Sequence, residues 1–358
     1  MIRIEPRPPV SGTVRLVLPL AAALAALALT AVPLLFAGAP VFTAYGLMLK
    51  GVAGSLFAFT ETLTRATPLI FTGLAAAVAF RARLWNIGAE GQLYLGALAC
   101  VWIGTGMIDA PALVLVPLVL LAGALAGAVG MIGPAWLRTR FGADEVVTTL
   151  LLNFIILIFV QMMLEGALKD PMGLGWPQSE PVLDAAMLPP LIDRMRLHWG
   201  FPLALVMAVL VHLLMSRTVW GFRIRAVGEN AAAARHAGLP VTRVLLSVAA
   251  LSGALAGLAG VSEVAGLKGY LTADLSPGFG YAGIVVAMLA GLSPLGVVVA
   301  AVYIAAVFVG ADSMSRELGV SSYLADLTVA LSLICVLLGG FFARYRIVRV
   351  PTVDAGQG

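Results

Sequence analysis

Charged residues are scarce in this sequence. Lys, Arg, Asp and Glu together make up 11% of its 358 residues, less than half of the roughly 25% that soluble domains carry. This deficit excludes a soluble enzyme, a disordered chain and a nucleic-acid-binding protein. The basic residues are scattered between apolar runs, so the formal net charge of +4 at pH 7 does not indicate a nucleic-acid partner.

Cysteine and histidine are also rare, and neither forms a reactive cluster. The two cysteines, Cys100 and Cys335, lie inside apolar runs and are interpreted as small buried hydrophobes. The histidines, His198, His212 and His236, are dispersed, and neither an H-E-x-x-H motif nor a phosphate-binding G-x-x-x-x-G-K-[ST] motif occurs. The sequence therefore predicts no metal site, no cofactor and no catalytic or ATPase site of the chain's own.

Long runs without charge are abundant, because 61% of the residues are hydrophobic. This apolar content would fill about ten membrane-spanning helices of roughly 20 residues each. We expect these helices at 16–36, 66–80, 89–107, 112–132, 146–168, 200–216, 244–262, 281–293, 294–310 and 324–342. Some of them, notably 66–80 and 281–293, are short for a bilayer, so short or broken helices are expected. The predicted fold class is an all-α polytopic membrane protein.

The basic residues orient these spans. With the N-terminus inside, the inner segments hold 15 of the 22 Lys and Arg residues and the outer segments hold seven, in agreement with the positive-inside rule. Both termini are then cytoplasmic, with a tail at 1–15, a single permease domain at 16–342 and a tail at 343–358. The longest inner loop is 217–243. The run 16–36 is interpreted as an uncleaved helix, since its 21 residues exceed the roughly 7–15 of a signal-peptide core.

The start of the third expected span is unusually polar. Asn86, Glu90 and Gln92 lie there, and Gly88 and Gly91 permit a backbone break or a close helix approach. A carboxylate at the start of a membrane helix is costly unless it pairs or faces water, so these side chains are candidates for lining a translocation path. The alternative is a helix cap, with the acid near the positive end of the helix dipole.

A second polar pattern marks the start of the fifth expected span. Glu145, Thr149 and Asn153 recur every four residues, with Thr148 beside them, so they form a polar stripe on an apolar helix. Polar atoms in a bilayer need partners, so the stripe is expected to face the interior of the bundle. It either lines a pore or joins helices by hydrogen bonds, and both interpretations stay open. The preceding Asp144 is typical of an N-cap.

The longest inner loop carries start and stop signals for a helix of its own. Asn230 can cap a short helix over 231–237, Gly238 can supply a left-handed C-terminal turn, and Pro240 blocks continuation. A small Ala-rich helix with a basic flank resembles a docking surface more than a catalytic loop. The alternative is an ordinary positively charged cytoplasmic loop.

Glycines recur in the seventh expected span at Gly253, Gly257 and Gly260. Because they lack side chains, they allow neighbouring helices to approach closely. Their spacing predicts a tightly packed helix face and not a phosphate-binding loop.

Three segments together resemble a known family. Residues 84–92 (LWNIGAEGQ) resemble the N-I-G-x-E-G-Q signature of ABC importer permeases of the branched-chain amino acid and ribose permease superfamily. Residues 142–153 are similar to the G-A-x-E-V-x-x-T-x-x-L-N helix of its nucleoside-type members, and residues 228–238 are similar to the coupling loop of the superfamily. The order and spacing of the three segments agree, and the resemblance spans residues 1–345.

The resemblance implies a transmembrane permease subunit of an importer in the bacterial cell (inner) membrane, which translocates its solute inward by alternating access. Its implied partners are a second permease subunit, often a paralogue, two ATP-binding subunits, which bind the ATP, and a solute-binding protein. The residues expected along the translocation path are Asn86, Glu90, Gln92, Glu145, Thr148, Thr149 and Asn153. Those expected in the ATPase-coupling loop are Gly228, Glu229, Asn230, Ala234, Arg235 and Gly238.

The expected cargo is a nucleoside. Few charges lie deep in the spans, so a strongly ionic solute would find few partners, whereas hydroxyl and amide groups could contact a nucleoside or a sugar. Ribose-like sugars and branched-chain amino acids are alternatives with the same mechanism. An ion-coupled secondary transporter usually places an essential acid near the midplane. Glu90 and Glu145 fall near inner helix ends, which makes that class the weaker alternative.

Overall fold

The computed structural model describes residues 2–6, 12–108 and 110–349 of the chain. Helices account for nearly all of the regular structure in these residues, which confirms the predicted all-helical fold class. The one addition is a pair of short strands near the two ends of the chain.

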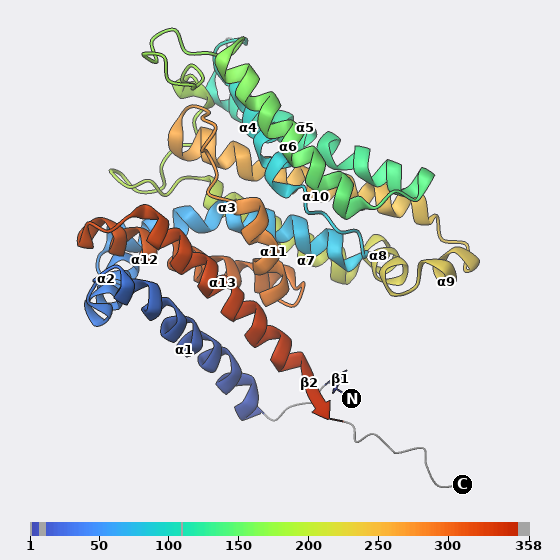
Figure 1. Cartoon of the computed structure of the whole chain (residues 1–358). Helices are drawn as coiled ribbons and strands as arrows, with labels where there is room; N and C mark the ends of the chain where they lie inside the picture. The colour runs from blue at the N-terminus through green and yellow to red at the C-terminus, as the bar shows by residue number, and fades with distance from the viewer. Residues whose placement is uncertain (1, 7–11, 109, 350–358) are drawn as a thin grey trace. The chain divides into compact units, whose positions relative to one another are not determined.

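The chain divides into two compact units, which can be followed by residue number in Figure 1. The smaller unit joins residues 1–49 with residues 310–358, and the larger unit comprises residues 50–309. The boundaries fall inside two helices, α2 (Val41–Ala53) and α12 (Pro294–Leu318). Each unit is described separately below.

The larger unit contains most of the helices. Their bounds are α3 Leu56–Arg81, α4 Ala89–Gly104, α5 Ala112–Phe141, α6 Glu145–Glu165, α7 Gly200–Arg217, α8 Val219–Glu229, α9 Ala231–His236, α10 Val241–Glu263 and α11 Phe279–Leu289. A 3₁₀ turn (Asp184–Ala186) lies in the long connection before α7, and a π-helical turn (Val264–Lys268) extends α10. Helix α10 is central, because it contacts α3, α4 and α5, as Figure 1 shows.

Glycines bring α4, α5 and α10 into backbone contact. A Cβ atom added at Gly127 of α5 would lie 2.2 Å from the carbonyl oxygen of Gly253, and one at Gly257 of α10 would lie 2.1 Å from that of Gly123. A Cβ at Gly96 of α4 would lie 2.1 Å from the carbonyl oxygen of Gly257. Real Cβ atoms do not approach other atoms so closely, so these positions accept only glycine. The predicted glycine face of the seventh span is therefore a packing seam, called the glycine seam below.

The sequence predicted that this helix begins at residue 66, but α3 begins at Leu56. Buried threonines, at positions 60, 62, 64 and 67, lower the apparent hydropathy of its first half. Each of these hydroxyls donates to a carbonyl three or four residues earlier in the same helix, at 2.9–3.1 Å. Because the carbonyl groups of the same helix accept these hydrogen bonds, the segment can be buried, although the sequence analysis assigned it to an outer loop.

In the smaller unit, α1 (Gly12–Phe36) packs along α13 (Ser322–Arg344), as Figure 1 shows. Strands β1 (Ile2–Pro6) and β2 (Tyr345–Arg349) pair antiparallel, with Ile2 opposite Arg349. The sequence analysis expected plain tails here. The pairing brings Ile2–Pro6 and Tyr345–Arg349 side by side in this unit.

A small apolar cluster closes the other end of the smaller unit. Leu34 of α1, Ala39, Ala44 of α2 and Met314 of α12 are buried together. The cluster forms where the chain turns sharply, because α1 and α2 meet at an angle of 118°. Since α2 does not continue the direction of α1, the pair is either one broken span or a re-entrant loop.

Among the described residues, seven helices are long and apolar enough to cross a membrane, or up to eight if α1 and α2 count as one broken span. Each of the ten expected spans coincides with a helix, but α4 and α11 have only 16 and 11 residues. At 1.5 Å per residue they reach about 24 and 16 Å, less than the roughly 30 Å of a hydrocarbon core. The expectation of short spans is thus confirmed for α11, while the run 66–80 belongs to a long helix.

Candidate functional site

Residues 82–88 connect α3 to α4 without helical structure, and Asn86 lies near their end. Helix α4 begins only at Ala89, so Asn86 does not share a helix face with Glu90. Instead, the Asn86 and Gln92 side-chain amides form a reciprocal pair: Nδ2 of Asn86 donates to Oε1 of Gln92 at 2.8 Å, and Nε2 of Gln92 donates to Oδ1 of Asn86 at 2.9 Å. Both residues are almost completely buried, so the pair fixes the connection against the first turn of α4.

A serine on α10 extends this pair to two further helices. Asn86 Nδ2 donates to Oγ of Ser252 at 2.9 Å, and Ser252 in turn donates to the carbonyl oxygen of Ala75 on α3 at 2.7 Å. The backbone N–H of Gly88 donates to Oδ1 of Asn86 at 2.9 Å. The Asn86 amide is therefore fully used by partners from within this chain.

The first residue of the polar stripe, Glu145 of α6, forms an ion pair with Arg138 of α5 at 2.5 Å. The same carboxylate accepts the backbone N–H of Trp85 at 3.3 Å, and Arg138 also donates to the carbonyl oxygen of Arg83 at 2.8 Å. The side chain of Glu145 is only 9% exposed. Because its charge is neutralised locally, the acid can remain buried at the end of the bundle.

The next two stripe residues hold the same connection one and two turns further along α6. Thr149 Oγ1 accepts the N–H of Ile87 at 3.3 Å. Asn153 Oδ1 accepts the N–H of Gly91 at 2.8 Å, and its Nδ2 donates to the carbonyl oxygen of Ile87 at 2.9 Å and to the hydroxyl of Tyr281 on α11 at 3.2 Å. The four-residue spacing therefore matches successive polar groups of the connection between α3 and α4.

Thr148 differs from its neighbours in the stripe. Its side chain is half-buried, and its hydroxyl donates to the carbonyl oxygen of Asp144 in its own helix at 3.0 Å. Asp144 is the predicted N-cap of α6, and it accepts the backbone N–H groups of Val146 and Val147. The structure thus does not bring Thr148 together with the other predicted path residues.

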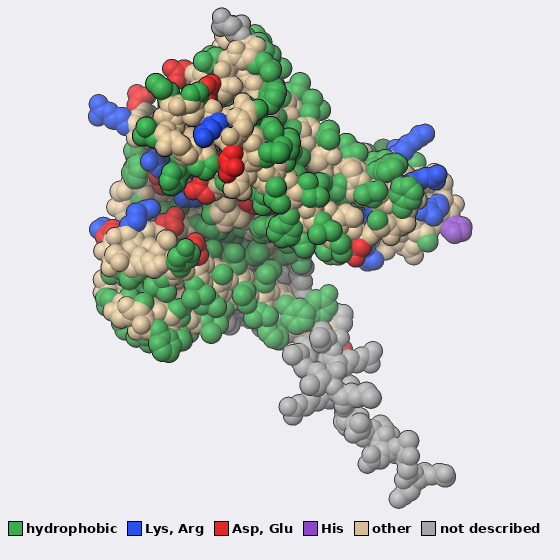
Figure 2. All heavy atoms as spheres, turned by 45° about the horizontal axis from the view of Figure 1, so that its top comes forward, with side chains coloured by type: hydrophobic (Ala, Val, Ile, Leu, Met, Phe, Trp, Pro, Cys, Tyr) green, Lys and Arg blue, Asp and Glu red, His purple; other side chains and the backbone are tan. Residues whose placement is uncertain are grey.

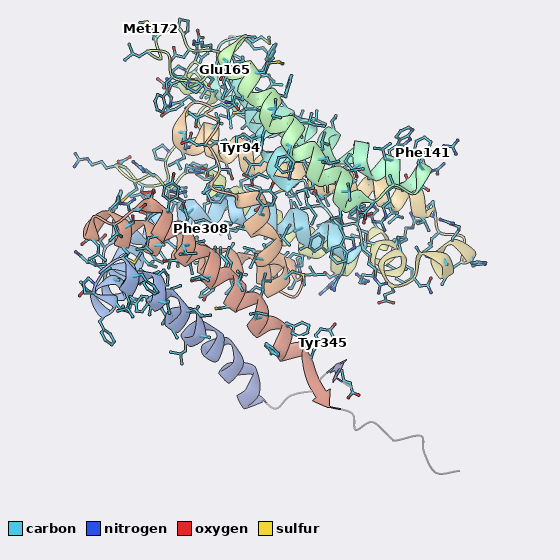
Figure 3. The ribbon with its side chains drawn as sticks, in the orientation of Figure 1. Tyr94, Phe141, Glu165, Met172, Phe308 and Tyr345 are labelled. Atoms are coloured by element: carbon cyan, nitrogen blue, oxygen red, sulfur yellow. The ribbon has the colours of Figure 1, made fainter. Side chains whose placement is uncertain are left out.

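Glu90 and Tyr94, one turn apart on α4, hold the segment that leads into α11. The carboxylate of Glu90 accepts the N–H of Gly280 at 2.6 Å. The hydroxyl of Tyr94 donates to the carbonyl oxygen of Ala273 at 2.7 Å and accepts the N–H of Ser276 at 3.2 Å. Figure 3 shows Tyr94 closer, in this view, to Glu165 at the end of α6 than to Phe141 at the end of α5.

The buried polar side chains that join these helices are called the polar hub below: Asn86, Glu90, Gln92, Glu145, Thr149, Asn153 and Ser252. Their hydrogen bonds are made within the chain, which favours the helix-joining interpretation of the stripe over direct pore lining. Sequence reasoning missed Ser252, Arg138 and Tyr94. For Ser252, the only indication in the sequence was a lone serine in an apolar helix. For Arg138 and Tyr94, the residue spacing did not indicate their partners.

The inner loop folds into two helices. Thr218 caps α8, which the sequence did not predict, by accepting the N–H of Gly221 at 3.1 Å. Nε1 of Trp220 donates to Oγ of Ser247 on α10 at 2.9 Å. A Cβ atom at Gly228 would lie 2.0 Å from the carbonyl oxygen of Arg81. Helix α8 is therefore packed tightly against the ends of α3 and α10, because only glycine fits at its contact with α3.

The short helix α9 follows the sequence prediction closely. Asn230 accepts the N–H of Ala233 at 3.0 Å, so it caps α9 while also ending α8. Gly238 adopts the left-handed conformation with φ +79° after the last turn. Ala234 is buried, whereas Glu229 and Arg235 are exposed. The helix therefore offers a small outward surface on a rigid base.

Among the charged side chains at the end of the larger unit formed by α8 and α9, Lys and Arg predominate, as Figure 2 shows. Exposed members of this group include Arg140 at the end of α5, Arg223 on α8 and Arg235 on α9. This is the end that the positive-inside rule places in the cytoplasm. The opposite end of the unit carries the long connection between α6 and α7.

Among the described residues, no group of three or more His, Cys, Asp or Glu side chains could hold a metal ion. The site consists instead of polar groups that fix helices to one another, next to a short helix exposed at one end. Apolar helices of bilayer length arranged around such an interior define a multi-pass membrane protein.

The chain belongs to the family described as branched-chain amino acid transport system permease components, which matches residues 58–338. It is 37% identical to the glucose ABC transporter permease protein of Haloferax volcanii, over 97% of this chain and 93% of that protein. It is 36% identical to the guanosine ABC transporter permease protein of Bacillus subtilis, over 90% of this chain and 92% of that protein. A nucleoside ABC transporter permease protein of Lactococcus lactis is 33% identical over 74% of this chain and 75% of that protein.

Family membership confirms several predictions. The protein is an ABC importer permease for nucleosides or sugars in a prokaryotic cell membrane, and it is a transport component without a catalytic domain. As a permease of this class, it works with ATPase and solute-binding partners.

Proposed function

We propose that the transported solute is a nucleoside. The observation that carries this proposal is the similarity to the guanosine permease over 90% of the chain. Two buried acids are not free to bind a charged solute, because Glu145 is paired with Arg138 and Glu90 accepts the N–H of Gly280. An amino acid would require counter-charges for its ammonium and carboxylate groups, and these two acids are already engaged.

A sugar is the second candidate, because the glucose permease matches this chain at 37% identity. Uptake of radiolabelled guanosine and glucose, measured in cells with and without the gene, tests both. Loss of guanosine uptake that only nucleosides compete for is the expected result. Loss of glucose uptake alone would assign a sugar cargo and refute the nucleoside.

We further propose that α8 and α9 transmit ATP hydrolysis to the permease, and that the complex contains a second, paralogous permease, two ATP-binding subunits and a solute-binding protein. The support is geometric. Helix α9 is capped at both ends and carries exposed Arg235. It follows α8, which ends at exposed Glu229 and packs tightly against α3 and α10. We therefore expect a displacement of α9 to move α3 and α10 without local unfolding of α8 or α9.

The charge reversal Arg235→Glu tests this docking role. In purified complex reconstituted into proteoliposomes, it should reduce uptake and solute-stimulated ATP hydrolysis while the permease stays folded. Arg140→Glu is the matched control, because Arg140 is an exposed arginine at the same end but on α5. Equal activity of the two variants would refute the docking role. Gly228 is unsuitable for this test, since any side chain there meets the carbonyl of Arg81.

We propose that the polar hub serves the translocation path by fixing the backbone of residues 82–91 and not by contacting the solute. The predicted path residues Asn86, Gln92, Thr149 and Asn153 are buried and bonded to that segment or to one another. Substitutions that break these bonds should lower folding stability together with uptake and leave the preference among solutes unchanged. A changed preference at unchanged stability would assign these residues to direct solute contact.

A further inference from the structure

The connection between α10 and α11 enters the larger unit from the side opposite α8 and α9. Near its start, Leu271 pairs with the long outer connection, because its N–H donates to Oγ of Ser179 and its carbonyl oxygen accepts the N–H of Ser179, both at 2.9 Å. At its end, the carbonyl oxygen of Phe279 accepts the hydroxyl of Thr72 on α3 at 3.0 Å. Figure 1 shows this connection, in orange, running from the end of α10 towards α3 before α11 begins. The chain therefore passes from the outer surface into the interior of the unit between Leu271 and Phe279.

Two contacts show how deep in the bundle α11 starts. At 1.5 Å per residue, Thr72 lies about 24 Å from the start of α3 and about 14 Å from its end. Tyr281, in the first turn of α11, accepts a hydrogen bond from Nδ2 of Asn153 at 3.2 Å. Asn153 lies about 12 Å from the start of α6 and about 18 Å from its end. Helix α11 therefore starts near the middle of a hydrocarbon core of roughly 30 Å, and the residues just before it lie in the outer half.

Residues 273–278, which precede α11, are fixed to the bundle on one side only. They have neither helical nor strand structure, and Leu275 among them is 1% exposed. The hydroxyl of Tyr94 on α4 donates to the carbonyl oxygen of Ala273 and accepts the N–H of Ser276. Backbone without regular hydrogen bonding is not tolerated against lipid. The other side of this segment must therefore face protein or water.

That other side carries an acid. Ala273, Asp274 and Pro277 are exposed, and Tyr281 at the start of α11 is 39% exposed. Nζ of Lys268 donates to the backbone carbonyl oxygen of Asp274 at 3.3 Å, so a second charged group lies close by. Charged groups within the thickness of a bilayer are strongly disfavoured against lipid and occur where they face water or the interior of a bundle. Burial of these charges against a neighbouring subunit would add a desolvation cost, so water is the environment that suits them best.

We propose that Ala273, Asp274 and Pro277 line the translocation path in the outer half of the bilayer. Their exposed side faces the aqueous route of the solute, while Tyr94 and Leu275 hold the opposite side of the segment against the bundle. The polar hub and this segment then have different roles, because the hub fixes backbone and the segment forms the wall of the path. The proposal rests on solute transport by this permease and not on the identity of the solute.

Thiol labelling of the purified permease–ATPase complex in lipid nanodiscs tests this wall. Ala273→Cys and Pro277→Cys are the two reporters, and a charged methanethiosulfonate reagent, which does not enter lipid, labels the permease chain where a thiol meets water. The native cysteines, Cys100 and Cys335, are buried, so the unsubstituted complex gives the background. Both reporters should react in the nucleotide-free or the vanadate-trapped state. Their rates should differ roughly threefold or more between the two states, because alternating access opens the path to one side at a time.

Two exposed positions away from the segment are the matched controls. Ile155→Cys, on α6 beside Asn153 and 61% exposed, has a similar depth and should not react in either state. Met172→Cys, 86% exposed in the connection beyond Glu165 (Figure 3), should react equally in both states. Absence of reaction at both reporters in both states, with full reaction after denaturation, would bury the segment against a neighbouring subunit and overturn the proposal. Reporter rates that do not change with the state, or that equal the rate of Ile155→Cys, would overturn it too.

These outcomes are separable from the cargo test. If the reporters show the expected dependence on state while cells take up glucose and not guanosine, the wall of the path stands and the nucleoside cargo is wrong. If cells take up guanosine but the reporters fail in any of these ways, the cargo stands and the path runs elsewhere.

Discussion

Replacing Asn153 by leucine removes the residue that holds the connection between α3 and α4 most firmly. Asn153 is fully buried, accepts the N–H of Gly91 at 2.8 Å and donates to the carbonyl of Ile87 at 2.9 Å. Leucine has a similar size and fills the space without these bonds. Both backbone groups then lose their partners, because they lie outside helical hydrogen bonding and are enclosed by α6.

The loss in the free energy of unfolding comes from the two backbone groups that lose their hydrogen-bond partner. A buried polar group without a partner costs about 1–3 kcal/mol. Hydrogen bonds between membrane helices average only about 0.6 kcal/mol and reach about 1.7, since unfolded helices in a bilayer find other partners. The lower part of the first range therefore applies, and two orphaned groups at about 1–2 kcal/mol each give a loss of about 2–4 kcal/mol.

The assay is unfolding of the purified permease in mixed micelles, with the fraction of sodium dodecyl sulfate as the denaturing variable. Thr148→Val is the control, because the Thr148 hydroxyl bonds only to the carbonyl of Asp144 in its own helix; it should cost less than about 0.5 kcal/mol. An Asn153→Leu midpoint within error of the Thr148→Val midpoint would show that the hub does not hold the connection, and the reasoning would fail.

Three further predictions use the same unfolding assay. Gly127→Ala should destabilise the permease by about 1–3 kcal/mol, because the added Cβ meets a backbone carbonyl. The control Gly133→Ala lies on the same helix, where the added Cβ has open space, and it should stabilise the permease by up to about 1 kcal/mol. Similar free energies of unfolding for the two variants would refute the glycine seam. Tyr94→Phe leaves the N–H of Ser276 and the carbonyl of Ala273 without their partner and should cost about 1–2 kcal/mol, which a midpoint equal to that of the wild type would exclude. For His198, the folded pKa of about 4 lies below the ordinary 6.5, so its neutral form favours folding: stability should be constant above pH 6.5 and fall by up to about 3 kcal/mol as the pH drops towards 4. His198→Asn should remove that slope, and an unchanged slope would assign it to other groups.

The sequence predicted the placement of most helices, because long uncharged runs are typical of helices that lie in a bilayer. It also predicted α9 with its cap at Asn230 and its turn at Gly238, since both are local signals. It failed for α8, whose residues alternate polar and apolar types without a clear run. What stabilises α8 is the contact of Gly228 with α3, and a contact between segments far apart in the chain leaves no local pattern.

For the polar hub too, the sequence predicted the local pattern but not the contacts with distant segments. The four-residue spacing of Glu145, Thr149 and Asn153 correctly predicted one buried helix face. The spacing could not show that this face meets a stretch of backbone between two helices, because such backbone contributes N–H and carbonyl groups whatever its residues are. Pore lining and helix joining therefore remained equally compatible with the sequence, and only the partners of the three side chains favour joining.

The glycine seam has an evolutionary consequence. Where two side chains clash, a second mutation can shorten the opposing side chain and restore the fit. In the seam, the atoms opposite Gly127 and Gly257 belong to backbone carbonyls, which no substitution can shorten. A larger residue at these positions thus has no local suppressor. A selection for restored transport in such mutants should return the original glycine or distant changes that strengthen the fold globally, and no compensating change on the facing helix.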